Sequence, residues 1–369
     1  MKNPMINFKK ASFLLLSICS LFSCSKDSEP VKIIETPTTN PPTTPVVDAD
    51  YVLTAEFRGS KTAIILWKDG VSRDISDGTY DEIPIDLEVS GNDVYILAEV
   101  NFTATSKIIR VYKNGTPTDI TVPSATTNPR ALDVVGNDVY IAGESYNATT
   151  NNTTLSYWKN GAKTDLLSNV FFSTLNDIKV VANSVYVLGS IRNANSNSEV
   201  TYWKDGAKTT IVNPVGFNSE ATSLDIVGTT VHITGYKSDT NVSNSKRPFY
   251  WNNTTETALL TNTTPAVDEF ANHISVSNGI VYIVGEANTT GGFRASLWKG
   301  AVQTIIEPTA TLPNFAKKVQ VNGTVVYVGG RQKFASNIEK ATVWKAGVAT
   351  RYVTTAATSS SLVDMHFKP

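Results

Sequence analysis

Hydrophobic and polar residues alternate in short runs along most of the chain after residue 50. One stretch shows four such runs in succession, at 131–135, 139–143, 155–159 and 163–167. Alternation with a period of two is typical of a β-strand with one buried and one exposed face. Between the last two runs, Asn160-Gly161 accepts the positive φ angles of a two-residue hairpin turn. The pattern therefore predicts a unit of four short antiparallel strands.

The same unit recurs at intervals of about 46 residues, which is the size of a four-stranded propeller blade. An aromatic residue marks one position of every copy and accounts for every tryptophan in the chain: Trp67, Tyr112, Trp158, Trp203, Trp251, Trp298 and Trp344. A hydrophobic residue followed by an aromatic one marks a second position, as in Val94-Tyr95 and Val139-Tyr140. Two independent markers with one period indicate seven structural repeats. We expect the tryptophans to pack between neighbouring units.

The first and last copies are incomplete in complementary ways. The repeats begin at Tyr51 with a second strand that has no first strand before it, and they end at 362–367 with a first strand that has no second strand after it. A ring in which the last strand completes the first unit removes an exposed sheet edge. The prediction is an all-β fold over residues 50–369, namely a seven-bladed β-propeller of four-stranded antiparallel blades, closed by the C-terminal strand pairing in the first blade.

Each second strand ends in a small residue. These residues are Thr54, Ala98, Gly143, Gly189, Gly235, Gly285 and Gly330. Their placement resembles that of kelch-type propellers, although only Gly329-Gly330 supplies the paired glycine of that family. The resemblance implies the four-stranded blade topology and assigns no functional residue.

Composition fits a folded, strand-rich chain and excludes one class of partner. Of the 369 residues, 41% are hydrophobic and 18% are charged, and 32 Lys and Arg stand against 33 Asp and Glu. A chain with a net charge of -1 has no surplus of cations to neutralise a phosphate backbone, so nucleic acid is not an expected partner. The only cysteines, Cys19 and Cys24, precede the repeats, so no disulfide is expected within them.

The N-terminus has the parts of an export signal. Three lysines precede a short apolar run at 11–22, which is too brief to span a bilayer. The run ends in Leu21-Phe22-Ser23-Cys24, which resembles the lipobox of bacterial lipoproteins. That resemblance implies cleavage before Cys24 and attachment of a diacylglycerol to its sulfur, so the expected membrane contact is through this N-terminal lipid.

The segment after Cys24 predicts a tether. Residues 25–29, Ser-Lys-Asp-Ser-Glu, resemble the acidic signal of Bacteroidetes-type lipoproteins that reach the cell surface. Proline and threonine dominate the stretch up to residue 49, a composition that favours extended conformations over a packed core. The expected organisation is a signal peptide at 1–23, a lipidated cysteine and tether at 24–49, and the propeller at 50–369. The expected location is the outer membrane, with the propeller at the cell surface.

One face of the first strand of each unit is polar. Six residues before each Val of the second marker, and at the matching place of the last strand, stand Glu88, Asp133, Lys179, Asp225, Ser275, Gln320 and His366. Two residues earlier stand Asp86, Ala131, Asp177, Ser223, His273, Lys318 and Asp364. The candidate ligand site in this axial ring consists of Glu88, Asp133, Lys179, Asp225, His273 and His366. Such a ring either binds a cation or polar ligand, or lines a water-filled channel and hydrogen-bonds neighbouring blades.

No catalytic motif accompanies this face, since the sequence holds neither H-E-x-x-H nor G-x-S-x-G. No catalytic residue and no cofactor is assigned. Asn-, Ser- and Thr-rich loops, such as 144–153 and 237–247, are expected together on one face, the top. We expect a non-enzymatic, lipid-anchored binding propeller that engages a glycan, peptide or protein through these top-face loops. Two alternatives stay open, a periplasm-facing scaffold lipoprotein of an envelope assembly and a metal-dependent hydrolase or lyase that uses the axial ring.

Overall fold

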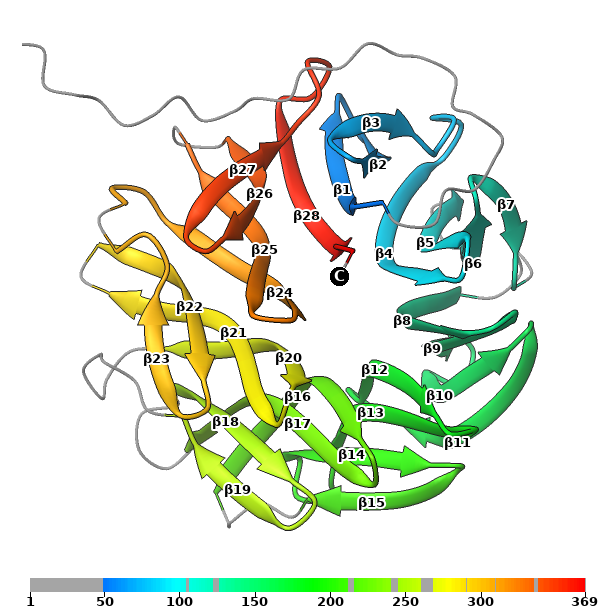
Figure 1. Cartoon of the computed structure of the whole chain (residues 1–369). Coiled ribbons are helices and arrows are strands. Elements are labelled where there is room, and N and C mark those ends of the chain that lie inside the picture. The colour runs from blue at the N-terminus through cyan, green and yellow to red at the C-terminus, as the bar shows by residue number, and fades with distance from the viewer. Residues whose placement is uncertain are drawn as a thin grey trace, which may run out of the picture. The chain divides into compact units, whose positions relative to one another are not determined.

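The computed structural model describes residues 49–103, 106–121, 126–211, 216–239, 245–259, 268–289, 291–308, 310–334 and 338–368. Within these ranges the chain forms β-strands and no helix, which confirms the prediction of an all-β fold. Accordingly, none of these residues belongs to a helix of the length and apolarity that crossing a membrane requires. Figure 1 shows the strands grouped into sheets around a central space.

Most of the sheets have four antiparallel strands, and each starts from an inner strand beside the central space (Figure 1). The sheet that contains the two ends of the described chain has the order β28-β1-β2-β3, with β28 Ser359–His366, β1 Tyr51–Arg58, β2 Lys61–Lys68 and β3 Val71–Asp74. A single parallel bridge between Lys107 and Thr126 joins the next two groups of four into one eight-stranded sheet.

The eight-stranded sheet consists of β4 Asp81–Ser90, β5 Asp93–Thr103, β6 Ser106–Lys113, β7 Thr116–Asp119, β8 Thr126–Val135, β9 Asp138–Asn147, β10 Asn152–Lys159 and β11 Ala162–Val170. The following two sheets consist of β12 Thr174–Val181, β13 Ser184–Arg192, β14 Ser198–Lys204 and β15 Ala207–Ile211, and of β16 Phe217–Val227, β17 Thr230–Asp239, β18 Lys246–Asn252 and β19 Thr255–Ala258. The last two consist of β20 Glu269–Ser277, β21 Ile280–Thr289, β22 Gly292–Lys299 and β23 Val302–Ile305, and of β24 Asn314–Asn322, β25 Val325–Lys333, β26 Glu339–Lys345 and β27 Val348–Tyr352.

The predicted hairpin turns between third and fourth strands have the expected backbone. Asn160 and Gly161 have φ angles of 49° and 84°, as a two-residue type I′ turn requires. The Asn160 side chain also accepts the backbone N–H of Val139 at 2.8 Å, which ties the turn to the start of the second strand. Asn or Asp at this place thus supplies both the positive φ and the hydrogen bond.

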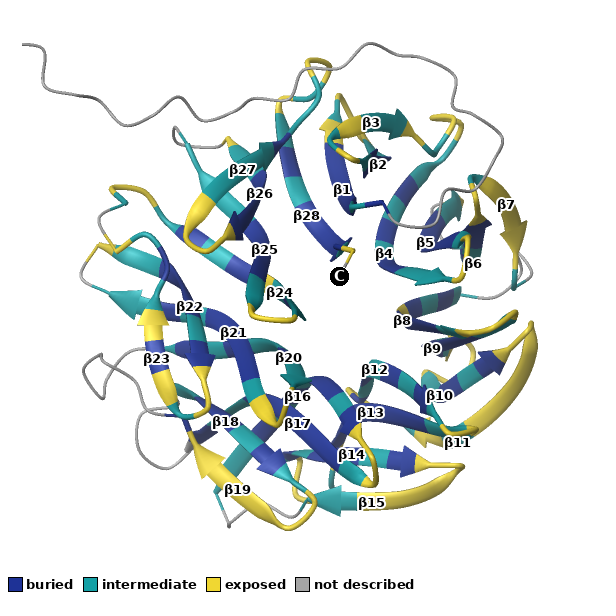
Figure 2. Ribbon diagram, viewed as in Figure 1, coloured by how far each residue is buried: buried dark blue, intermediate teal, exposed yellow. Residues whose placement is uncertain are grey.

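The aromatic marker residues belong to core clusters that join neighbouring sheets, as predicted. Figure 2 shows that the outermost strands, such as β11 and β19, are largely exposed, whereas the strands further in are largely buried. Trp67, Trp203, Trp298 and Trp344 are only 0–1% exposed. Trp158 of β10 packs against Tyr95 and Leu97 of β5, so it contacts the preceding group of strands. Burial of an aromatic of this size contributes about 2–3 kcal/mol to stability, and the marker recurs because each junction between sheets needs this contact.

Each inner strand carries a β-bulge at the same place in its repeat. In β8, Pro129 pairs with Gly143 and Ala131 with Ala142, so Arg130 is an extra residue. The extra residues of all the inner strands are Ile85, Arg130, Asn176, Thr222, Asn272, Lys317 and Val363. The bulge presses the inner backbone onto the second strand, where a Cβ on Gly143 would lie 2.6 Å from the Asn128 carbonyl oxygen. This close approach explains the glycine found at this place in five of the second strands, namely Gly143, Gly189, Gly235, Gly285 and Gly330. The prediction that the small residues end these strands is wrong, because each second strand continues beyond them.

The C-terminal strand joins both ends of the described chain. β28 pairs antiparallel with β1, with Tyr51 opposite His366 and Phe57 opposite Ser359. Its buried Leu362 and Met365 also belong to the core cluster that holds Tyr327 and Val343 of the preceding sheet. The inner strands β4, β8, β12, β16, β20, β24 and β28 contact one another in this order, and β28 also contacts β4.

The contribution of β28 can be measured with one buried side chain. Leu362 is 1% exposed, so Leu362→Ala should lower the free energy of unfolding by about 2–5 kcal/mol through lost burial and a cavity. Val348 of β27 is 71% exposed, and Val348→Ala should change it by at most about 0.5 kcal/mol. Urea denaturation gives both values. Equal stability of the two variants would show that β28 is not docked as described.

Candidate functional site

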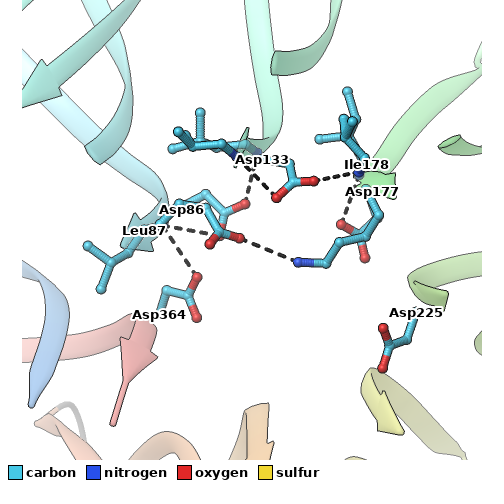
Figure 3. Close-up of polar contacts among 12 residues, drawn as sticks. Asp86, Leu87, Asp133, Asp177, Ile178, Asp225 and Asp364 are labelled. Carbon is cyan, nitrogen blue, oxygen red and sulfur yellow. Dashed lines mark hydrogen bonds and ion pairs between the residues drawn. The ribbon is translucent and has the colours of Figure 1, made fainter. Parts of the chain in front are cut away.

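The polar face of the inner strands lines the central space. Figure 3 shows Asp86, Asp133, Asp177, Asp225 and Asp364 projecting into it from different strands. Each inner strand offers two axial positions. The position nearer the strand start is called the first level and comprises Asp86, Ala131, Asp177, Ser223, His273, Lys318 and Asp364. The second level comprises Glu88, Asp133, Lys179, Asp225, Ser275, Gln320 and His366.

The five aspartates of this face make the same pair of hydrogen bonds. One carboxylate oxygen accepts the N–H of the following residue, and the other accepts a backbone N–H of the next inner strand. The bonds to the next strand join Asp86 to Leu132 (2.9 Å), Asp133 to Val180, Asp177 to Leu224 (2.8 Å), Asp225 to Val276 (2.7 Å) and Asp364 to Leu87 (3.3 Å). An inner strand is the edge of its sheet, so these carboxylates satisfy N–H groups that the sheet itself leaves unpaired.

His273 and Gln320 make the corresponding contacts for the two remaining strands. The Nδ1 atom of His273 accepts the Val319 N–H at 3.4 Å, which places the proton of a neutral ring on Nε2. Burial and the nearby Lys318 lower the pKa of His273 well below its usual value, so the ring is neutral at physiological pH. The Gln320 amide both accepts the Phe367 N–H (2.6 Å) and donates to the Phe367 carbonyl (2.8 Å).

The side chain that bonds to the next inner strand, called the bridging side chain, lies at the first level on one inner strand and at the second level on the following one. Asp86 on β4 is at the first level, Asp133 on β8 at the second and Asp177 on β12 at the first, and the pattern continues through Asp225, His273 and Gln320. The described residues form seven such inner strands, and β28 contacts β4, so strict alternation between two levels cannot hold at every one of these contacts. It fails between β28 and β4, where Asp364 and Asp86 both occupy the first level.

The place where Asp364 of β28 meets Asp86 of β4 is called the seam, and Lys318 holds the two carboxyl groups there. Its Nζ lies 3.2 Å from Asp86 Oδ1 and 3.2 Å from Asp364 Oδ2. Against the effect of burial, Lys318 and a hydrogen bond from Asp364 lower the pKa of Asp86 below its usual range. Burial and the adjacent Asp86 raise the pKa of Asp364 well above its usual range. Of the two carboxyl groups, Asp364 is therefore the one that takes up a proton first as the pH falls.

A second ion pair lies at the second level. Lys179 Nζ is 3.4 Å from Glu88 Oε1, which joins β12 to β4 across the central space. Burial raises the pKa of Glu88 to about 7, although Lys179 opposes this shift. The Glu88 carboxylate in turn raises the pKa of Lys179 well above its usual value. His366 lies at the end of β28, opposite Tyr51, and burial lowers its pKa.

The six candidate ligand residues thus lie on one face but have different surroundings. Asp133, Asp225 and His273 are engaged in bridges between strands, whereas Glu88 and Lys179 pair with each other. Ligand binding by this set stays a prediction. Asp86, Lys318 and Asp364, which form the seam, were not part of the predicted ligand set although they lie on the same face. Over the described ranges, no group of three or more His, Cys, Asp or Glu side chains is placed to hold a metal ion.

Two chambers lie along the axis. The upper chamber, where the inner strands begin, has a volume of about 520 Å³, and the lower chamber, where they end, about 270 Å³. Asp86, Asp177, His273 and Lys318 line both, so the first level forms the boundary between them. The upper chamber is large enough for a small ligand or a short chain segment.

The β-bulges build the wall of the upper chamber. The bulge residues that line it are Ile85, Arg130, Asn176, Thr222, Asn272 and Lys317. A bulge redirects the side chain of its extra residue, and here the shift turns that side chain towards the axis. Sequence reasoning missed these residues because strict alternation assigns them to the apolar face. Their polarity was the available signal, since five of the six are polar where an apolar residue was expected.

Solved structures of low identity share this fold. A puromycin-hydrolyzing peptidase from Mycobacterium tuberculosis matches with a TM-score of 0.57 and 12% identity, over 84% of this chain and 52% of that one. The β-propeller domain of the Trilobed protease from Pyrococcus furiosus matches with a TM-score of 0.53 and 17% identity, over 83% of this chain and 96% of that one. Pyrococcus horikoshii acylaminoacyl peptidase matches with a TM-score of 0.54 and 15% identity, over 82% of this chain and 50% of that one.

These matches confirm the β-propeller class of the fold, at identities that show the fold alone. The chain spans about half the length of two of the matched proteins. No protein-family model matches the chain, and no curated protein matches it. The prediction of a non-enzymatic binding propeller that works through its top-face loops is wrong on this comparison, because the matched propellers belong to peptidases. The comparison does not bear on the lipid anchor, which stays a prediction.

The bridging role of the aspartates predicts a measurable loss of stability. Asp225→Ala leaves the Ile226 and Val276 N–H groups without their acceptor and should lower the free energy of unfolding by about 1–3 kcal/mol. Asp225→Asn keeps one acceptor oxygen and should lower the free energy of unfolding by less than Asp225→Ala does. Ser275, at the second level of β20, is the matched control, because His273 makes the bridge of that strand. Ser275→Ala should stay within about 0.5 kcal/mol of the wild type, and an equally stable Asp225→Ala would refute the bridge.

Proposed function

We propose that this chain is a peptide-binding propeller that serves peptide hydrolysis, and that the upper chamber is its peptide site. The observation that carries the proposal is the chemistry of the chamber wall, which combines apolar and polar side chains. A peptide segment presents the same mixture, since its backbone needs hydrogen-bond partners and its side chains need apolar contact. The volume of about 520 Å³ is within the range of ordinary ligand pockets.

The apolar and polar residues of the wall come from several strands. Ile83 and Ile85 of β4 and Leu362 of β28 are among the apolar residues of the wall. Among the polar residues, the Asn272 amide donates to the Ala316 carbonyl at 2.8 Å, and the Thr222 hydroxyl donates to the Ala271 carbonyl at 2.9 Å. Both side chains are therefore held by the next strand, and their oxygens can accept N–H groups of a bound peptide.

The comparisons support the link to peptide hydrolysis only through the shared fold. The strongest support is the match to 96% of the propeller domain of a protease, because that domain is nearly as long as the repeats of this chain. In the proposal the propeller binds the peptide, and a separate domain or chain cleaves it.

We also propose that the sheets are seven blades of one closed, kelch-like propeller. The pairing of β28 with β1 and the bridge from Asp364 to Leu87 of β4 support closure, because they link the last described strand to the first two groups of strands.

The N-terminal segment completes the proposal. Residues 1–48 lie outside the described residues, so the signal peptide, the lipid on Cys24 and the outer-membrane location rest on the sequence. In the proposal Cys24 carries the lipid and holds the propeller at the membrane through the tether. Cys24→Ala should abolish acyl labelling and release the protein from the membrane fraction, and continued labelling would contradict the anchor.

Filling the upper chamber should block peptide binding. Asn176 lines the chamber and makes only one long side-chain contact, 3.4 Å from the Ser190 hydroxyl, so Asn176→Phe should fill space without unfolding the protein. Asn195→Phe, in the exposed loop between β13 and β14 of the same sheet, is the matched control. The measurement is the affinity of fluorescent hexapeptide mixtures for each purified variant, with thermal melts to check folding.

A loss of affinity of at least about tenfold in Asn176→Phe, with Asn195→Phe unchanged, is the expected result, since tenfold corresponds to about 1.4 kcal/mol of lost contact. Two results would overturn the proposal. One is the absence of peptide binding to the wild type, and the other is unchanged affinity in Asn176→Phe.

A further inference from the structure

One cation in the upper chamber has no ion-pair partner among the described residues. Lys317 is the bulge residue of β24, and its exposed side chain lines this chamber. The other cations of the wall are paired: Arg130 with Glu144 at 2.9 Å, Arg331 with Glu339 at 3.0 Å, and Lys318 with the seam carboxyls. Lys317 is therefore the positive charge of the chamber that remains available to a ligand.

The surroundings of Lys317 favour an anion. Lys318 is its neighbour in sequence, and Arg331 lines the same chamber. The Lys317 side chain has access to solvent in the chamber, but the surrounding wall desolvates its ammonium, and this desolvation, together with repulsion from Lys318, lowers the pKa of Lys317 to about 8. At neutral pH the ammonium is mostly charged but poorly compensated, and a bound anion would relieve the repulsion among these cations.

The carboxyl groups of the chamber cannot take the place of that anion. Asp86 of the wall and its neighbour Asp364 are both held by Lys318. Burial raises the pKa of Glu286, which lowers its charge, and one of its oxygens accepts the Asn272 amide at 3.3 Å. Asp177, the remaining carboxyl of the wall, accepts the Leu224 N–H at 2.8 Å and the Ser223 hydroxyl at 2.9 Å. An anion that enters the chamber can therefore supply the compensating charge.

We propose that Lys317 binds a carboxylate of the peptide in the upper chamber, an inference that rests on the function proposed above. A lysine ammonium is a point charge on a flexible stem, so it accepts a terminal or a side-chain carboxylate without a fixed geometry. Phe315, two residues before Lys317 on β24, lines the same wall and offers a ring to the carbon atoms next to the carboxylate. Arg331 stacks on that ring, with its guanidinium carbon 4.5 Å from the ring centroid.

The test compares three peptides of one length on the whole propeller. They are N-acetyl-tetraalanine as the free acid, the same peptide as the C-terminal amide, and an amidated version with one internal Asp. Calorimetry on the wild type should show the free acid binding about tenfold tighter than the plain amide, as one charge-assisted hydrogen bond in a partly enclosed site provides. Tight binding of the internal-Asp amide as well would mean that either carboxylate serves, whereas weak binding would assign the site to the C-terminus.

Lys317→Met removes the charge and keeps the length of the side chain, so it should bind acid and amide equally. Lys208→Met, on the exposed outer strand β15, is the matched control and should keep the tenfold preference. In the wild type the preference should fall as the pH rises from 7 to 9, because Lys317 loses its proton while the peptide carboxylate stays ionised.

The outcomes separate this inference from the proposed function. Binding of acid and amide with equal affinity to the wild type, or a preference that survives Lys317→Met, would refute the role of Lys317 and leave peptide binding intact. Failure of all three peptides to bind would overturn the peptide site and the Lys317 inference together. A preference that Lys317→Met abolishes and Lys208→Met retains would establish the inference.

Discussion

The hydrogen bond from a backbone N–H of one inner strand to a side chain of the preceding inner strand is the interaction on which the rest of the structure depends. An inner strand is the edge of its sheet, and an unpaired edge N–H facing the axis costs free energy when it is shielded from water. The aspartates remove that cost at most junctions and fix the spacing of the strands at the same time. Once the strands are fixed, the bulge residues of all the inner strands except β28 face the same space, where they form the wall of the upper chamber.

The odd number of inner strands shapes the chemistry of the chamber. Because the bridging level alternates, two carboxyl groups meet at the seam between β28 and β4, and Lys318 is needed to hold them. The Lys318 ammonium is therefore already engaged by these two carboxyl groups. Lys317, turned into the chamber by the bulge, is left beside it without a partner in the described part of the chain. A constraint on strand number thus leads to a cationic site that the repeat pattern alone does not suggest.

Sequence periodicity predicted the framework well because each of its signals reports a local requirement. The tryptophans fill the junctions between sheets, and Asn160-Gly161 forms the turn that its φ angles allow. The polar face of the inner strands was also predicted, including the Glu88 and Lys179 that pair across the axis. These features follow from residue type and from a period of two, which the sequence displays directly.

The chamber could not be predicted in the same way. A bulge adds one residue to a strand and so interrupts the alternation of side chains between the two faces of the sheet. A strict period of two therefore assigned the bulge residues Asn176 and Lys317 to the apolar face. The meeting of Asp86 and Asp364 at the seam depends on which side chain of each inner strand reaches the next strand. Only the three-dimensional register of the strands decides this. The expected function also failed, since it relied on the composition of the top-face loops, whereas the solved structures of the same fold belong to peptidases.

Amide hydrogen exchange tests the bridging interaction most directly. The N–H groups of Leu132, Leu224 and Val276 donate to the aspartates of the preceding inner strands. The account predicts that they exchange as slowly as N–H groups inside the sheets, and that Asp225→Ala accelerates the exchange of Val276 while Leu132 stays protected. Exchange of all three amides at the rate of unbonded edge amides in the wild type would contradict it.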